Sequence, residues 1–218
     1  MAQASQLPVH GLSDGARAIL GVAKRLFAEK GFDAVSINQI AQQAGVSKAN
    51  VFHHFTSKDA LYLAVLKVAC EETVGSLAEA HSSGNAGEDL WSFFSSHLAA
   101  MLANQASARL ILREIMESKN EREQTLAEHV FAEYFSRLVG MVSEGQTQGL
   151  LRKGFDPALL AYLMLGANVF FFENHTVTAH LAEGGFARTP DRYSHDVFRL
   201  LLQGALVDPE TDIQFTEA

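Results

Sequence analysis

The sequence predicts an all-α protein, and three observations support this. Proline is scarce, with four residues in 218, and no alternating β-branched run is long enough to form a strand. Apolar residues instead recur every three or four positions over most of the chain, which is the period of an amphipathic helix. With 48% hydrophobic and 19% charged residues, the composition is globular and excludes a disordered or collagen-like chain.

Cysteine usage and hydropathy indicate where the protein works. Cys70 is the only cysteine, so an intrachain disulfide and a cysteine-based zinc site are excluded. A single thiol fits a reducing compartment, and we expect a cytoplasmic protein. Residues 1–18 lack the basic start and apolar run of a secretory signal. The longest apolar stretch, 159–172, is shorter than the ~20 residues of a membrane span, so we expect no membrane partner.

Charge is distributed unevenly along the chain, whose net charge is −8. Residues 1–59 carry six Lys/Arg and four Asp/Glu, a balance of +2, whereas residues 60–218 carry 11 and 21, a balance of −10. This asymmetry favours a small anion-binding head on an acidic body. Six basic residues in such a segment are equally compatible with chance, so charge alone does not decide.

Side-chain caps and glycines delimit the first two expected helices. Ser13 caps a helix that runs to about residue 30, where Gly31 ends it. Ser36 begins a short second helix, and Gln39, three residues later, completes a capping box. Gly45 ends this second helix.

Serine also begins the next two helices. Ser47 caps a third helix that ends near Phe55, and Ser57 caps a fourth, which we extend to about His81. Residues 82–87 form the clearest linker. Apolar spacing predicts further helices at about 88–104, 106–117, 120–148, 157–181 and 191–206.

Residues 37–56, INQIAQQAGVSKANVFHHFT, have the spacing of a helix-turn-helix. Ala41 provides a small residue where the two helices cross, Gly45 tolerates a positive φ in the turn, and Val51 points back into the core. This arrangement would place the second helix, which begins after Ser47, across the major groove of DNA. The same spacing also fits any tight helical hairpin.

The outward positions of that second helix favour DNA. They are Lys48, Asn50, His53 and His54. No acid occurs between Asp33 and Asp59, whereas the solvated face of a hairpin more often carries Glu–Lys pairs. Asn pairs with adenine edges, Lys pairs with guanine or phosphate, and the ring of Phe52 would fit a thymine methyl group. Side chains near helix starts are placed to hold phosphate oxygens, and these are Ser36, His54, Ser57 and Lys58.

The stretch GFDAVSINQIAQQAGVSKANVFHHFTSKDALYLAVL closely resembles the amino-terminal domain of the TetR/AcrR family of bacterial transcriptional regulators. The specific resemblance covers roughly residues 14–70. It implies a homodimer that represses or otherwise regulates transcription and releases a palindromic DNA operator when a small molecule binds. We expect a flexible arm over residues 1–12, a DNA-binding domain over 13–56 and a ligand-binding and dimerisation domain over 57–218.

Matching this motif residue by residue extends the predicted DNA contacts. Family members read bases or nearby backbone at the positions of Lys48, Ala49, Asn50 and His53, and His54 and Lys58 match phosphate-contacting residues. Two departures occur: Phe52 replaces the usual tyrosine, and Ala49 replaces a frequent glycine or proline. The predicted DNA-binding set is Ser36, Ser47, Lys48, Ala49, Asn50, Phe52, His53, His54, Ser57 and Lys58.

The acidic remainder of the chain is expected to be a helical bundle that binds a ligand and dimerises. Residues 159–172 are apolar nearly all round, which predicts burial on more than one side. Together with 191–206 they would form a four-helix contact across a two-fold axis. The alternative is a central helix of a monomer.

Large apolar residues and the polar groups among them are the predicted effector contacts, although most of these residues also suit a plain core. The apolar character of this set favours a hydrophobic or aromatic effector. We expect no cofactor and no metal. The predicted set is Trp91, Phe94, Leu98, Met101, Arg113, Met116, Phe131, Tyr134, Phe135, Asn168, Phe171, Phe172 and His175.

Enzymes are the main competing class. The chain has no G-x-S-x-G, Walker, G-x-G-x-x-G or H-E-x-x-H motif, and no Glu-x-x-His pair for a di-iron site. We therefore expect a regulator and no catalytic residue. The alternative is a helical protein-interaction module, or a cofactor-free enzyme, that does not bind DNA.

Overall fold

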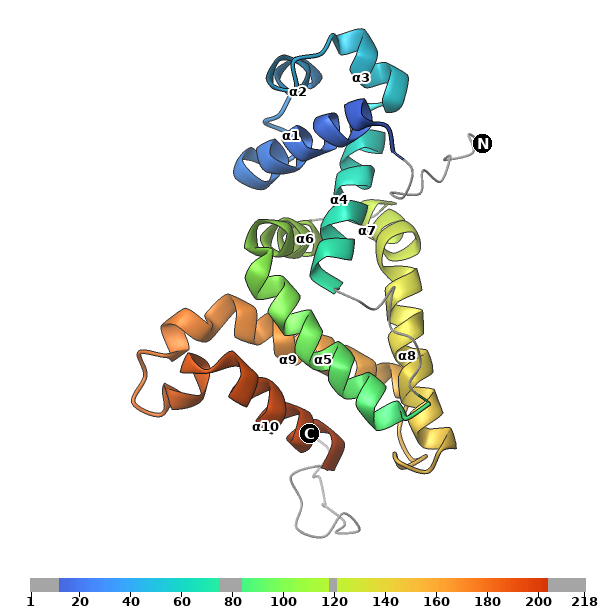
Figure 1. Cartoon of the computed structure of the whole chain (residues 1–218), viewed down its shortest axis with the longest axis vertical. Helices are drawn as coiled ribbons and strands as arrows, with labels where there is room; N and C mark the ends of the chain where they lie inside the picture. The colour runs from blue at the N-terminus through green and yellow to red at the C-terminus, as the bar shows by residue number, and fades with distance from the viewer. Residues whose placement is uncertain (1–11, 75–83, 118–120, 204–218) are drawn as a thin grey trace, which may run out of the picture. The chain divides into compact units, whose positions relative to one another are not determined.

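The computed structural model describes residues 12–74, 84–117 and 121–203, and within these ranges it contains helices and no strand (Figure 1). The all-α prediction is confirmed. The helices are α1 (Asp14–Lys30), α2 (Ile37–Gln43), α3 (Lys48–His54), α4 (Lys58–Val74), α5 (Ala86–Ala103), α6 (Gln105–Glu117), α7 (Glu121–Leu126), α8 (Ala132–Thr147), α9 (Pro157–Thr178) and α10 (Pro190–Gln203). A π-helical turn, η2 (Ala127–Phe131), joins α7 to α8, and a 3₁₀ turn, η3 (Gly184–Arg188), lies between α9 and α10.

The chain divides into two compact units. Unit 1 contains Met1–Gly75 and Ala100–Tyr134, and unit 2 contains Ser76–Ala99 and Phe135–Ala218. The functional division that we expect after residue 56 therefore lies inside unit 1, where α4 and α6 pack against α1. The expected arm over residues 1–12 lies almost entirely outside the described residues.

Unit 1 begins with the three helices that the caps predict, of which α2 and α3 are short. The Ser13 hydroxyl accepts a hydrogen bond from the Ala16 amide at 3.3 Å, and Gly31 ends α1 with a φ of 81°. Both partners of the Ser36–Gln39 capping box are present, at 2.9 and 3.2 Å. These local bonds fix the ends of α1 and α2 and so define the turn between them.

The turn between α2 and α3 also follows the prediction. Gly45 has a φ of 67°, a conformation that L side chains rarely adopt. Ala41 and Val51 are buried, with 4% and 0% of their surface exposed. Because Val51 is directed into the core, the opposite side of α3 is left facing outward.

Hydrogen bonds and ion pairs link α1, α4 and α6 within unit 1. The Lys24 ammonium contacts both carboxylate oxygens of Glu72 at 2.6 and 2.7 Å. The Ser107 hydroxyl donates to the same carboxylate, and the Asn104 amide donates to the backbone oxygen of Glu72 at 3.0 Å. The described part of α4 ends at Val74, so its predicted continuation to residue 81 lies outside the described residues.

The single helix expected over 120–148 is wrong, because η2 interrupts it. In a π-helical turn the backbone hydrogen bonds join residues five apart instead of four, and the spacing of apolar residues does not reveal this change. The buried thiol of Cys70 lies 3.9 Å from the backbone oxygen of Val130 in η2 and donates to it. Burial raises the pKa of this thiol to about 12, so it stays protonated at neutral pH.

Unit 2 is built around α9. Its N-cap Asp156 accepts a hydrogen bond from the Ala158 amide at 2.9 Å, and Pro157 occupies the first turn, where no amide donor is needed. The guanidinium of Arg188 in η3 donates to the backbone oxygen of Ala179, just past the end of α9. No helix among the described residues combines the length and the apolar character needed to cross a lipid bilayer.

Candidate nucleic-acid interface and ligand site

The outward side of α3 presents a continuous polar and basic surface. Lys48, Ala49, Asn50 and His53 are exposed, and none of the residues from Lys48 to His54 is acidic. Phe52 is 41% exposed, and the Lys48 ammonium lies 5.8 Å from the centre of its ring. This surface combines donors, acceptors and an apolar ring, which are the groups that read base edges in a major groove.

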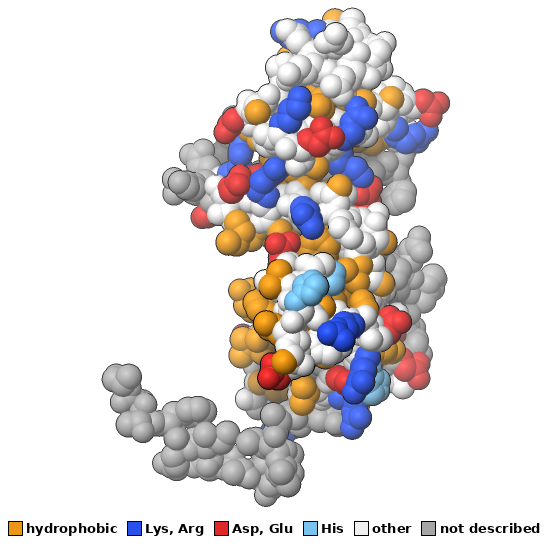
Figure 2. All heavy atoms as spheres, turned by 90° about the vertical axis from the view of Figure 1, so that its left-hand side faces the viewer, with side chains coloured by type: hydrophobic (Ala, Val, Ile, Leu, Met, Phe, Trp, Pro, Cys, Tyr) orange, Lys and Arg blue, Asp and Glu red, His pale blue; other side chains and the backbone are white. Residues whose placement is uncertain are grey.

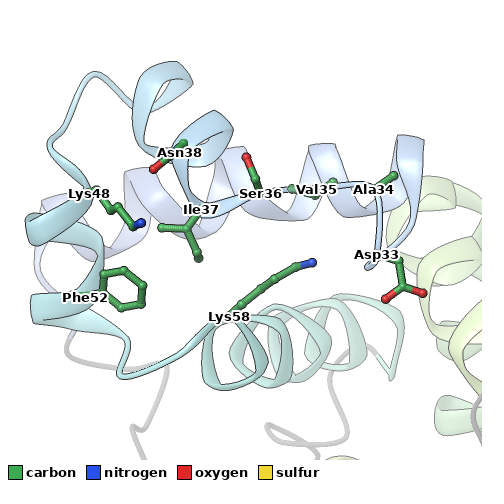
Figure 3. A pocket seen from close by; sticks show the side chains of 9 residues that line it. All are labelled: Asp33, Ala34, Val35, Ser36, Ile37, Asn38, Lys48, Phe52 and Lys58. Carbon is green, nitrogen blue, oxygen red and sulfur yellow. The ribbon is translucent and has the colours of Figure 1, made fainter.

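A hollow of about 400 Å³ adjoins α3 (Figure 3). Lys48 and Phe52 lie on one side of it, and Lys58, from the start of α4, extends below the segment that leads into α2. Asp33 is the one acidic residue that lines it. The two lysines make the hollow positively charged overall, as binding to a DNA phosphate requires.

The predicted serines are partly engaged by the backbone. The hydroxyls of Ser36, Ser47 and Ser57 accept hydrogen bonds from backbone amides three residues later, at 3.2, 3.1 and 3.0 Å. A hydroxyl that accepts in this way can still donate its proton, so each remains able to bond a phosphate oxygen. The half-buried ring of His54 packs edge-on to His53, with 5.1 Å between ring centres.

Lys58 lies beside an aromatic ring that the sequence-based site did not include. Its ammonium is 4.1 Å from the centre of the Phe32 ring, and the guanidinium of Arg122 is 4.5 Å from the same centre. Phe32 follows the Gly31 turn, and Arg122 belongs to α7. The sequence carries no signal for this contact because the two residues lie far apart in the chain.

The predicted ligand residues fall into two groups. The members in unit 2 are Trp91, Phe94, Leu98, Phe135, Asn168, Phe171, Phe172 and His175. Phe94, Asn168 and Phe171 lie in its core, and the Phe171 ring stacks on His175 at 5.2 Å and on Tyr193 at 4.0 Å. Trp91 is half-buried and packs against Phe198, 5.3 Å between ring centres.

The other predicted ligand residues belong to unit 1: Met101, Arg113, Met116, Phe131 and Tyr134. Arg113 donates to the backbone oxygens of Phe27 and Ala28 and thereby holds the end of α1. Met116 is 83% exposed. Met101 is buried, and Phe131 and Tyr134 are half-buried in or beside the π-helical turn. Helical spacing cannot reveal these surroundings, because the covering elements come from elsewhere in the chain.

Two buried polar side chains meet in the core of unit 2. The Asn168 amide nitrogen donates to the backbone oxygen of Phe94 at 2.9 Å and lies 3.2 Å from Nδ1 of His97. Two acceptors cannot face each other, so the Phe94 oxygen fixes the orientation of the amide, and His97 must accept at Nδ1. Burial lowers the pKa of His97 to about 4, so the ring is neutral with its proton on Nε2.

This arrangement leaves hydrogen-bonding capacity inside unit 2. The Asn168 side-chain oxygen is fully buried and has no hydrogen-bond partner among the described residues. A buried acceptor of this kind costs about 1–3 kcal/mol unless a donor reaches it. The Asn168 oxygen is therefore a candidate for a polar contact in the otherwise apolar core of unit 2.

Comparison with known proteins identifies the family. Residues 19–65 match the family described as "Bacterial regulatory proteins, tetR family", and residues 87–198, more than half of the chain, match "Tetracyclin repressor-like, C-terminal domain". The chain belongs to the TetR family. It is therefore a helix-turn-helix transcriptional regulator with a C-terminal ligand-binding domain, and not an enzyme.

Individual relatives agree with this assignment. The Fatty acid metabolism regulator protein of Bacillus subtilis is 24% identical over 149 residues, covering 68% of this chain and 76% of the relative. The HTH-type transcriptional regulator RutR of Escherichia coli is 49% identical over 51 residues, 23% of this chain and 24% of RutR. The crystal structure of FadR from Bacillus subtilis in complex with stearoyl-CoA has a TM-score of 0.71 at 21% identity, covering 87% of this chain and 99% of FadR.

Proposed function

We propose that this TetR-family regulator is a homodimeric repressor, in which α3 of each protomer binds one half of a palindromic operator. The exposed, acid-free face of α3 beside Lys48 and Lys58 carries this proposal. Asn50 and Lys48 would read base edges, and Lys58 would bind phosphate. Because an operator-binding protein must reach the chromosome, a cytoplasmic location is part of this proposal.

The two faces of α9 support the homodimer. One face is buried in unit 2, whereas the other exposes between 47% and 71% of the surface of Leu159, Tyr162, Leu163, Phe170 and Val177. Hydrophobic side chains also gather on the lower part of the face in Figure 2. A large exposed apolar surface is typical of a subunit interface. A two-fold contact would also let two α3 helices reach successive major grooves, about 34–36 Å apart.

The buried pair of Asn168 and His97 supports an effector site in unit 2. Asn168 offers a buried side-chain oxygen without a hydrogen-bond partner among the described residues, and the neutral His97 ring, which accepts at Nδ1, carries a proton on Nε2 that can be donated. A long-chain acyl thioester matches both, because its carbonyl accepts, the amides of its pantetheine arm donate, and its chain suits an apolar core. The stearoyl-CoA in the crystal structure of FadR and the name of the Fatty acid metabolism regulator protein, both from Bacillus subtilis, support the same ligand class.

Equilibrium binding to a labelled duplex from directly upstream of the coding sequence tests this function. We expect tight binding that weakens steeply as salt rises, and dissociation when stearoyl-CoA is added. The ligand must bind the DNA-free state more tightly than the DNA-bound state, or it shifts nothing. Stearic acid and free coenzyme A separate the contributions of the chain and the head group. Equal operator affinity with and without stearoyl-CoA would rule out this effector class.

A further inference from the structure

We infer that Arg122, which lies outside the helix-turn-helix, is a positioning residue for DNA binding. The inference rests on the proposed contact between Lys58 and a DNA phosphate. Arg122 acts through Phe32, whose ring it shares with Lys58. A segment of α7 would thus set the geometry of a DNA contact that begins at α4.

Phe32 is held as a rigid platform. Its ring lies 4.7 Å from that of Tyr62 and 5.9 Å from that of Phe27, measured between centres. Phe27 is fully buried, and Tyr62 is 4% exposed. Packing on two buried rings restrains the side of Phe32 that faces the core, and the cations restrain the remainder.

Arg122 is itself anchored by carboxylates. Its Nε lies 3.6 Å from Glu114, and its Nη2 lies 3.9 Å from Asp59. Glu114 is only 5% exposed, and its other carboxylate oxygen accepts a hydrogen bond of 2.7 Å from the Tyr62 hydroxyl. Two acids therefore balance the charge of Arg122, so its expected contribution to DNA affinity is geometric and not a further positive charge.

The restrained Phe32 ring matters most for the Lys58 side chain. A lysine carries its charge on a flexible four-carbon stem and loses side-chain entropy when it is fixed. The Phe32 ring, 4.1 Å from the ammonium, restrains this stem before DNA arrives. Figure 3 shows Lys58 stretched beneath the segment from Asp33 to Ser36, at the edge of the hollow next to α3. Without Arg122, both the ring and the lysine gain freedom, and the phosphate contact weakens.

Arg122 has to be tested in a parent variant in which the buried carboxylate of Glu114 is replaced by a neutral group. Removing Arg122 alone would leave Glu114 as an unpaired buried charge and could unfold the protein. Glu114→Gln keeps an acceptor for Tyr62, so Glu114→Gln/Arg122→Met is compared with Glu114→Gln. Phe32→Leu provides a second route that leaves the ion pair intact. Arg109→Met, at an exposed arginine of α6, controls for the lost charge.

The readout is the slope of log affinity against log salt for the labelled upstream duplex, which falls by about 0.9 for each lost phosphate contact. We expect Lys58→Met, Phe32→Leu and Glu114→Gln/Arg122→Met each to lower the slope by about this amount and the affinity about tenfold. Glu114→Gln, Arg109→Met and the conservative Arg122→Lys should keep the slope. If Arg122 only stabilised the fold, the variant would contain less folded protein, but the folded molecules would show the wild-type slope of log affinity against log salt.

Combining variants decides whether Arg122 acts through Lys58. If it does, Lys58→Met/Glu114→Gln/Arg122→Met binds no more weakly than Lys58→Met/Glu114→Gln. An additive loss, or a Glu114→Gln/Arg122→Met slope equal to that of Glu114→Gln, overturns the inference while the proposed function stands. An unchanged slope in Lys58→Met instead overturns the proposed phosphate contact.

Discussion

The Asn168 amide nitrogen lies 3.2 Å from Nδ1 of His97 in the core of unit 2. Both residues are buried, and burial lowers the pKa of His97 to about 4. In mild acid the unfolded chain binds a proton at this histidine and the folded chain does not. Protonation therefore favours the unfolded state, and the stability of the folded state falls as the pH falls.

Acid should therefore destabilise the protein through His97. The unfolded histidine titrates near pH 6.5, so stability is lost as pH falls from about 6.5 to about 4, by up to about 1.4 kcal/mol per pH unit. Urea unfolding at several pH values measures this loss. His97→Gln, which keeps an acceptor for Asn168, should flatten the profile in that window. An identical profile in the variant would show that His97 is not the responsible group.

Asn50 should determine sequence preference and Lys58 overall affinity. Asn50→Ala is expected to cost about 1–3 kcal/mol on the preferred operator and to relax selection at one base pair, because a bidentate base contact is lost. Lys58→Met should weaken all sequences alike. Selection of binding sites from a randomised DNA pool distinguishes the two outcomes, and an unchanged preference in Asn50→Ala would contradict its assignment to base reading.

The exposed face of α9 should hold the dimer together. Phe170 is 71% exposed, and Phe170→Glu would place a charge in the centre of the proposed apolar contact. Sedimentation equilibrium should then give a monomer, whereas Leu150→Glu, at a 53% exposed leucine outside α9, should remain dimeric. A wild-type protein that stays monomeric at high concentration would refute the interface.

Neighbouring glycines of η3 should differ sharply in tolerance. A Cβ at Gly184 would overlap the backbone oxygen of Thr178, whereas a Cβ at Gly185 would meet open space. Gly184→Ala is therefore expected to lower stability by about 1–3 kcal/mol, because η3 must shift together with its Arg188 cap on α9. Gly185→Ala should stay within about 0.5 kcal/mol of the wild type. Thermal unfolding compares them, and equal melting temperatures would contradict this packing.

Local signals explain which parts of the fold could be predicted. The hydroxyls of Ser13, Ser36 and Ser47 accept hydrogen bonds from amides three residues away, and Gly31 and Gly45 adopt positive φ. The bounds of α1, α2 and α3 therefore follow from neighbouring residues. The π-helical turn at 127–131 could not be predicted, because it changes the hydrogen-bonding period without changing the apolar pattern.

The candidate sites likewise contain parts that neighbouring residues predict and parts that only the tertiary structure reveals. The outward face of α3 follows from the inward direction of Val51 alone. The roles of Arg113 and Arg122 depend on contacts with Phe27 and Phe32, which only the tertiary structure brings near them. A sequence pattern shows which face of a helix is apolar but does not identify the element that covers it.

Hydroxyl-radical footprinting of the upstream DNA tests most directly whether paired α3 helices bind an operator. We expect two symmetric protected segments with centres about one helical turn apart, and their loss when Lys48 and Asn50 are replaced by alanine. Protection that persists in this double variant, or an absence of protection with the wild-type protein at saturating concentration, would contradict DNA recognition by α3.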